Sequence, residues 1–300
     1  MNNKNKIFIL GIFFFISIIF SYFFSEDTLG GARIDYNFHE KFIVLFAEDF
    51  KNTFNNYGHD ELYARNSPVF YIFLSLIYKA GIDLESIRYV NVISIPLLFY
   101  IFYECLKIQF KNINKHLLIF FSFVIFLSPT VRSLVVWPYP ILYGLIFFLF
   151  SVKYYLKFFE EKKFKIREAQ KNTFFLALAS YITPNFSVFA IFFLYKFFLG
   201  FKDKRYFTYI IILNCLLATP AFIYYFLNDF YLFNTAVFGV DLGVKLNIFN
   251  KIVIILSLIL FYFIPFINKE TIKNYIKDLK NFHKEYFLII FFLISVYFFN

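Results

Sequence analysis

An aspartate and a histidine lie one helical turn apart in the first polar stretch of the chain. Asp35 opens a helical pattern that extends to residue 50. Its large apolar residues recur at helical spacing, at Phe38, Phe42, Phe46 and Phe50. At about 100° per residue, Asp35 and His39 fall on that apolar face and are expected to point toward buried surface. A carboxylate beside an imidazole can accept a proton, so Asp35 is a candidate general base and His39 a residue that orients it or the acceptor.

Each of these two residues also has a structural explanation. An aspartate directly before an amphipathic run is a preferred helix N-cap, and a partly buried histidine often only completes a hydrogen bond. Asp49 lies on the same face but 14 residues later, about 21 Å along a helix. It cannot share a reacting atom with Asp35, and it remains an alternative base.

Three arginines near the expected external surface are candidates for binding a phosphate. Arg65, Arg88 and Arg132 each offer the forked donors that suit an anion. Arg132 is isolated in an apolar hairpin, residues 128–140, that also holds the only tryptophan, Trp137. The alternative is that these arginines extend to lipid headgroups and that Trp137 is an interfacial anchor.

One polar triplet, His59, Asp60 and Glu61, could supply ligands to a divalent cation. Three consecutive polar residues are typical of a solvated loop, so we predict no metal site, and the cofactor is left open. Cys105 and Cys215 both lie in apolar runs without metal-ligand spacing.

The composition indicates what must position these residues. Hydrophobic residues make up 60% of the 300 residues, and 52 residues are phenylalanine; a soluble domain lacks the polar surface to enclose so much apolar material. The net charge of +10 arises from lysines and arginines in short loops between apolar runs, where they set orientation and do not indicate nucleic acid. We predict an all-α, multi-pass membrane protein.

The charge pattern orients the chain. Residues 7–24 form a first span, and Lys4 and Lys6 before it place the N-terminus in the cytoplasm. No small-residue cleavage site ends this run, which argues against a cleaved signal peptide. Residues 25–87 form a long external loop, in which residues 25–66 carry eight acidic and four basic residues. Residues 69–80 are too few to cross about 30 Å of hydrocarbon, so we expect an interfacial helix.

Residues 88–300 supply the remaining spans of a single transmembrane domain with about nine spans. Thr183-Pro184-Asn185 interrupts residues 172–200, so two short helices meeting at an external turn are expected there. The last apolar run has 14 residues, about 21 Å of helix; it either tilts against its neighbours or belongs to a chain that continues further. The predicted spans after the first are residues 88–106, 117–127, 141–159, the two halves of 172–200, 207–227, 252–267 and 286–299.

The polar residues that could carry out chemistry are concentrated at the expected external face. Charged residues are almost missing from the centres of the spans, which argues against a proton-coupled pump. The chain also lacks a glycine-rich phosphate loop and the His-Glu-x-x-His and Gly-x-Ser-x-Gly motifs.

Residues 7–200 resemble the GT-C superfamily of integral membrane glycosyltransferases, notably the protein mannosyltransferases and the bacterial aminoarabinose transferases. The resemblance consists of four features in chain order. A single N-terminal span comes first, and a long external loop with an acidic residue near its start follows. An interfacial helix then begins after a proline motif, and the next span begins near an arginine. The usual acidic pair is absent. The motifs are Ile34-Asp35-Tyr36 followed by His39, Arg65-Asn66-Ser67-Pro68-Val69-Phe70-Tyr71, and Ser86-Ile87-Arg88-Tyr89-Val90-Asn91.

The resemblance implies an enzyme with the GT-C fold that moves a sugar from a polyprenyl-phosphate donor to a lipid-linked glycan, lipid or protein acceptor at the external face, with inversion. Asp35 matches the essential carboxylate of that family's first loop. The expected setting is a bacterial plasma membrane. The competing hypothesis is a non-enzymatic lipid or glycan flippase, transporter or assembly subunit, in which polar residues would line a path between helices.

Overall fold

The computed structural model describes residues 3–27, 31–59, 62, 66–124, 126, 128–160 and 164–228. These belong to one compact unit, residues 1–229, and residues 230–300 lie outside the described part. Every regular element of the described residues is helical, which confirms the all-α prediction. The α-helices are α1 (Asn3–Phe23), α2 (Ala32–Glu48), α3 (Phe50–Asn56), α4 (Pro68–Lys79), α5 (Leu84–Gln109), α6 (Lys115–Val124), α7 (Pro129–Val136), α8 (Pro140–Phe159), α9 (Ile166–Ile182), α10 (Phe189–Gly200) and α11 (Lys204–Leu227).

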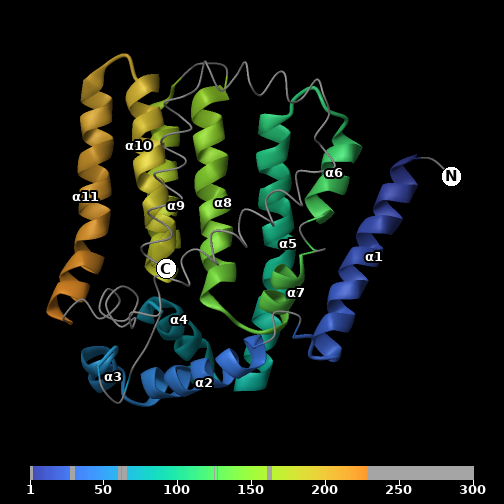
Figure 1. Cartoon of the computed structure of the whole chain (residues 1–300), viewed down its shortest axis with the longest axis vertical. Coiled ribbons are helices and arrows are strands. Elements are labelled where there is room, and N and C mark those ends of the chain that lie inside the picture. The colour runs from blue at the N-terminus through green and yellow to red at the C-terminus, as the bar shows by residue number, and fades with distance from the viewer. Residues whose placement is uncertain are drawn as a thin grey trace, which may run out of the picture. The chain divides into compact units, whose positions relative to one another are not determined.

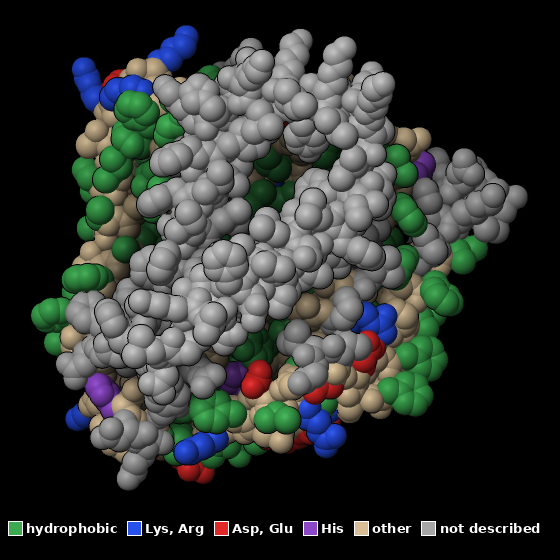
Figure 2. Space-filling view, in the orientation of Figure 1, with side chains coloured by type: hydrophobic (Ala, Val, Ile, Leu, Met, Phe, Trp, Pro, Cys, Tyr) green, Lys and Arg blue, Asp and Glu red, His purple; other side chains and the backbone are tan. Residues whose placement is uncertain are grey.

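The long helices stand side by side and the helices of the first loop cross one end of them. Figure 1 shows α1, α5, α8, α9, α10 and α11 running lengthwise, with α2, α3 and α4 across what we call the α2 end. The turns after α5 and after α10 lie at the opposite end. Figure 2 shows apolar side chains along α11 and along the C-terminal part of α1, and charged side chains over both ends.

Among the described residues three helices, α5, α8 and α11, are long and apolar enough to cross a membrane. The 26 residues of α5 reach about 39 Å, more than the hydrocarbon thickness of about 30 Å. This supports the multi-pass membrane class. The count of nine spans stays a prediction, and the two spans predicted after residue 250 lie outside the described residues.

Two helix boundaries lie where the sequence predicted them. Ser67 caps α4, its side chain accepting from the Val69 amide, and Pro68 follows at the first helical position. The 12 residues of α4 are about 18 Å long, too short to span, as predicted. The chain also breaks after Ile182: α9 gives way to a 3-10 turn, Pro184–Val188, before α10 begins.

The connection expected as an external hairpin, residues 128–140, contains a helix that was not predicted from the sequence. Ser128 and Pro129 start the helix α7, which packs against α1, α5 and α8. Its side chains Leu134 and Val135 are buried in the core between α5 and α8. Trp137 is only 4% exposed, so it is a core residue and not an interfacial anchor.

Candidate functional site

The helix α2 starts earlier than the sequence pattern suggested, because another aspartate caps it. Asp27 Oδ1 accepts hydrogen bonds from the amides of Gly31 and Ala32, and Oδ2 accepts from Arg33. These bonds satisfy donors that a helix start leaves unpaired. Asp35 lies in the first turn, where its own amide donates to the Gly31 carbonyl. Asp35 is therefore not the N-cap.

The two residues expected to share a buried face are separated by the fold. His39 is 2% exposed, whereas Asp35 is exposed at the start of α2, contrary to the expectation. In the part of the chain that the structure describes, Asp35 forms no ion pair. The carboxylate is thus available to a molecule that approaches the α2 end.

The imidazole of His39 is fixed by a chain of hydrogen bonds. The Tyr71 hydroxyl accepts a hydrogen bond from Asn66 Nδ2 at 3.2 Å and is hydrogen-bonded to His39 Nδ1 at 2.7 Å. The other ring nitrogen of His39, Nε2, is buried and has no hydrogen-bond partner among the described residues. Burial lowers the pKa of His39 from 6.5 to about 4. At neutral pH His39 is therefore a neutral ring that joins α2 to α4.

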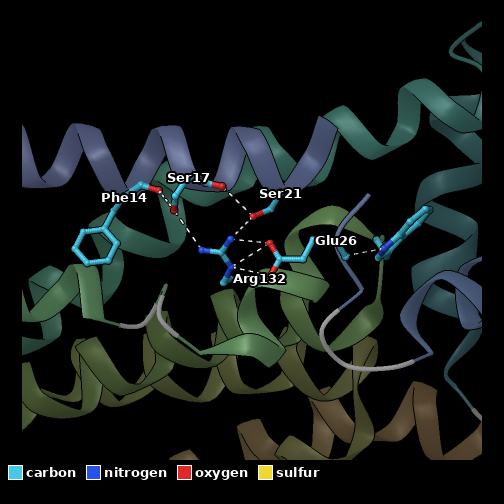
Figure 3. A network of polar contacts seen from close by, with 6 residues as sticks. Phe14, Ser17, Ser21, Glu26 and Arg132 are labelled. Atoms are coloured by element: carbon cyan, nitrogen blue, oxygen red, sulfur yellow. Dashed lines mark hydrogen bonds and ion pairs between the residues drawn. The ribbon is translucent and has the colours of Figure 1, made fainter. Parts of the chain in front are cut away.

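Arg132 reaches from α7 to α1 and to the segment that follows it (Figure 3). Its Nη2 donates to Glu26 Oε2 at 2.6 Å and its Nε donates to Oε1 at 3.0 Å. Further hydrogen bonds join the guanidinium to the hydroxyls of Ser17 and Ser21. The hydrogen bond from Arg132 is the largest cause of a lowered Glu26 pKa. The guanidinium is already paired, so it ties α7 to α1.

Arg88 is likewise enclosed. It is 4% exposed, donates to the Val136 carbonyl and pairs with Glu85. Its guanidinium carbon lies 4.0 Å from the centroid of the Trp137 ring and 4.8 Å from that of Tyr22. Both geometries are cation–π contacts. Arg88 and Arg132 are thus brought to one region, around Trp137, each with its own carboxylate.

A third arginine in this region was missed by the sequence reasoning. Arg33 is exposed, and its guanidinium carbon lies 5.8 Å from the Trp137 ring centroid. Within the described residues no carboxylate pairs with it. Only its position two residues before Asp35 could have suggested it, because the contact with Trp137 spans more than a hundred residues.

The other candidate residues named from the sequence either lie outside the described part of the chain or have a structural role. Arg65, Asp60 and Glu61 lie outside the described residues. Asp49 is the N-cap of α3, and its side chain accepts a hydrogen bond from the Asn52 amide. The helix α2 ends one residue before it, at Glu48, so Asp49 has a structural role. Across the described ranges no group of His, Cys, Asp and Glu side chains could hold a metal ion.

The chain matches no protein family model, no curated protein and no solved structure. What can be said about function therefore depends on the residues at the α2 end.

Proposed function

We propose that the chain is a membrane glycosyltransferase that moves a sugar from a polyprenyl-phosphate donor to a glycan, lipid or protein acceptor at the α2 end. The observation that supports this most is the exposed carboxylate of Asp35, which forms no ion pair with a described residue and lies on a helix that crosses the end of membrane-length helices. A lipid-linked donor can reach this position along the bundle, and an acceptor can reach it from water.

In the proposed reaction Asp35 is the general base. The acceptor hydroxyl gives its proton to the Asp35 carboxylate while its oxygen bonds to the anomeric carbon of the sugar. The bond from that carbon to the phosphate oxygen breaks, and the electron pair leaves with the phosphate. Such a base contributes about 10²- to 10⁴-fold to the rate.

The departing phosphate carries negative charge that cations must stabilise. Arg33 is the cation best suited to this role, because it is exposed and no described carboxylate pairs with it. Arg88 and Arg132 are paired with glutamates and hold the surrounding elements in place. We assign His39 a positioning role, since its neutral ring fixes α2 on α4 through Tyr71.

The test compares glycolipids and glycoproteins of the host by mass spectrometry in five strains: wild type, a deletion, Asp35→Asn, Asp49→Asn and Glu48→Gln. Because Asp27 caps α2, Asp35→Asn removes the base without removing the cap. Glu48 is an exposed carboxylate in the last turn of the same helix, so Glu48→Gln is the matched control. All variants are compared at equal abundance in the membrane.

We expect the deletion and Asp35→Asn to lose the same sugar mass and Glu48→Gln to keep it. A glycan loss in the deletion that Asp35→Asn does not reproduce would contradict the role of Asp35 and favour the flippase, transporter or assembly hypothesis. A loss with Asp49→Asn alone would move the base to Asp49.

A further inference from the structure

An apolar groove lies between α1, α5 and α6, away from Asp35. Its volume of about 830 Å³ is within the range of about 300–1,000 Å³ that is usual for small-molecule sites. Figure 1 shows α6 at the opposite end of the bundle from α2. No residue of the proposed glycosyltransferase site lines the groove.

The walls of the groove are apolar and aromatic. Phe123 of α6 stacks on Phe99 of α5, with ring centroids 4.3 Å apart, and on Phe14 of α1 at 6.0 Å. Gly11 lets α1 approach α6 closely, because a Cβ there would lie 2.5 Å from the Phe123 ring. Ile12, which is 44% exposed, lines the groove from α1. Such a surface suits a hydrocarbon chain.

The rim of the groove is cationic. Lys107 at the end of α5 and Lys115 at the start of α6 both line it, and both are exposed. The one acid of the lining, Glu104, is already shared between Lys107 at 3.4 Å and the buried Lys153 at 3.5 Å. The acid is offset by Lys153, so the two rim lysines leave an excess of positive charge.

We propose that this groove binds an anionic phospholipid, with an acyl chain between α1, α5 and α6 and its phosphate at Lys107 and Lys115. The lipid comes from the leaflet at the end opposite α2. Charge complementarity selects the headgroup: a lysine near an anionic headgroup contributes about 1 kcal/mol, or about fivefold in affinity.

The experiment uses the full chain purified in neutral detergent. Photoreactive phosphatidylglycerol with a diazirine in one acyl chain is the probe, and phosphatidylcholine with the same chains is its comparison. Native mass spectrometry counts bound lipids, and peptide mapping locates the crosslink. Lys107→Gln combined with Lys115→Gln tests the headgroup contact. The matched control is Lys202→Gln combined with Arg205→Gln, two exposed cations in and after the turn that precedes α11.

We expect one phosphatidylglycerol per chain, bound about tenfold or more in preference to phosphatidylcholine and crosslinked to α1, α5 or α6. The rim double variant should weaken its binding about 10- to 30-fold, and the control should not. Ile12→Trp should fill the groove and abolish binding, whereas Ile16→Trp, at an exposed residue of α1 outside the lining, should not.

Equal binding of the two lipids, or a crosslink outside these helices, would overturn the proposal. So would displacement of the lipid by millimolar inorganic phosphate alone, because the site would then recognise phosphate without the chain. If Ile12→Trp does not fold, the surface lysine variants decide the question. Activity of Asp35→Asn is not part of this test, so the two proposals fail independently.

Discussion

Lowering the pH from 7 to 5 should destabilise the protein through His39. The folded state holds this histidine buried with a pKa of about 4, and the unfolded chain has the ordinary value of about 6.5. At a pH between these two pKa values, His39 is protonated in the unfolded state and neutral in the folded state. Stability therefore falls as the pH falls through this window. From pH 7 to pH 5 the loss is about 2 kcal/mol, from these two pKa values.

The assay is thermal unfolding in neutral detergent at pH 7, 6 and 5, followed by the fluorescence of Trp137, which is the only tryptophan and is buried. A loss of 2 kcal/mol corresponds to about 4–8 °C in Tm for a domain of this size. His39→Asn removes the titration while offering Tyr71 an acceptor where Nδ1 stood. The difference in slope between wild type and this variant isolates His39 from carboxylates that also protonate.

Wild type should lose several degrees more than His39→Asn between pH 7 and pH 5. His59→Asn, a change at the half-buried histidine of the turn after α3, should keep the wild-type slope. If His39→Asn and wild type lose stability in parallel, the argument that His39 is buried as a neutral ring is wrong.

Two further pairs of variants test the packing that holds the site. Glu26→Gln should cost about 1–3 kcal/mol in thermal unfolding, because the Glu26 carboxylate, 22% exposed, accepts three hydrogen bonds from Arg132. Glu85→Gln changes a carboxylate that is 69% exposed and accepts one hydrogen bond from Arg88, and Arg88 keeps the Val136 carbonyl and the Tyr22 and Trp137 rings, so it should cost less than about 1 kcal/mol; equal losses would contradict this ranking. Gly144→Ala should destabilise by about 1–3 kcal/mol, because the new Cβ would lie 2.7 Å from the Thr183 hydroxyl oxygen, and Gly31→Ala, with open space around it, should be near neutral. Unchanged unfolding of Gly144→Ala would mean that α8 and the end of α9 are further apart than described.

Much of the helical layout followed from local sequence. Ser67 and Pro68 predicted the start of α4, and the lengths of the apolar runs predicted that α5, α8 and α11 are long, because capping and helix length depend on neighbouring residues. The run at residues 117–127 was expected to span, but α6 has only 10 residues. The break at Pro184 was predicted for the same reason, since proline removes a hydrogen bond within its own helix. The burial of His39 followed from helical periodicity alone.

The site itself was predicted only in part. Periodicity placed Asp35 on the buried face with His39, but in the first turn of α2 it is Ala32 and Tyr36 that pack inward, beside Trp137. Asp35, next to Tyr36 on the helix, is therefore left exposed. The expected hairpin proved to be a helix because Leu134 and Val135 find a core between α5 and α8.

Contacts between distant parts of the chain were decided by tertiary structure. Arg132 pairs with Glu26 across 106 residues, and Arg33 lies over Trp137; no local pattern encodes either contact. The sequence by itself determined most of the helical segments and which of them are apolar, because these depend on propensity and spacing along the chain. Which cations are paired, and which carboxylate is left exposed, depended on how the helices pack, because only packing brings charges from separate segments within reach of one another.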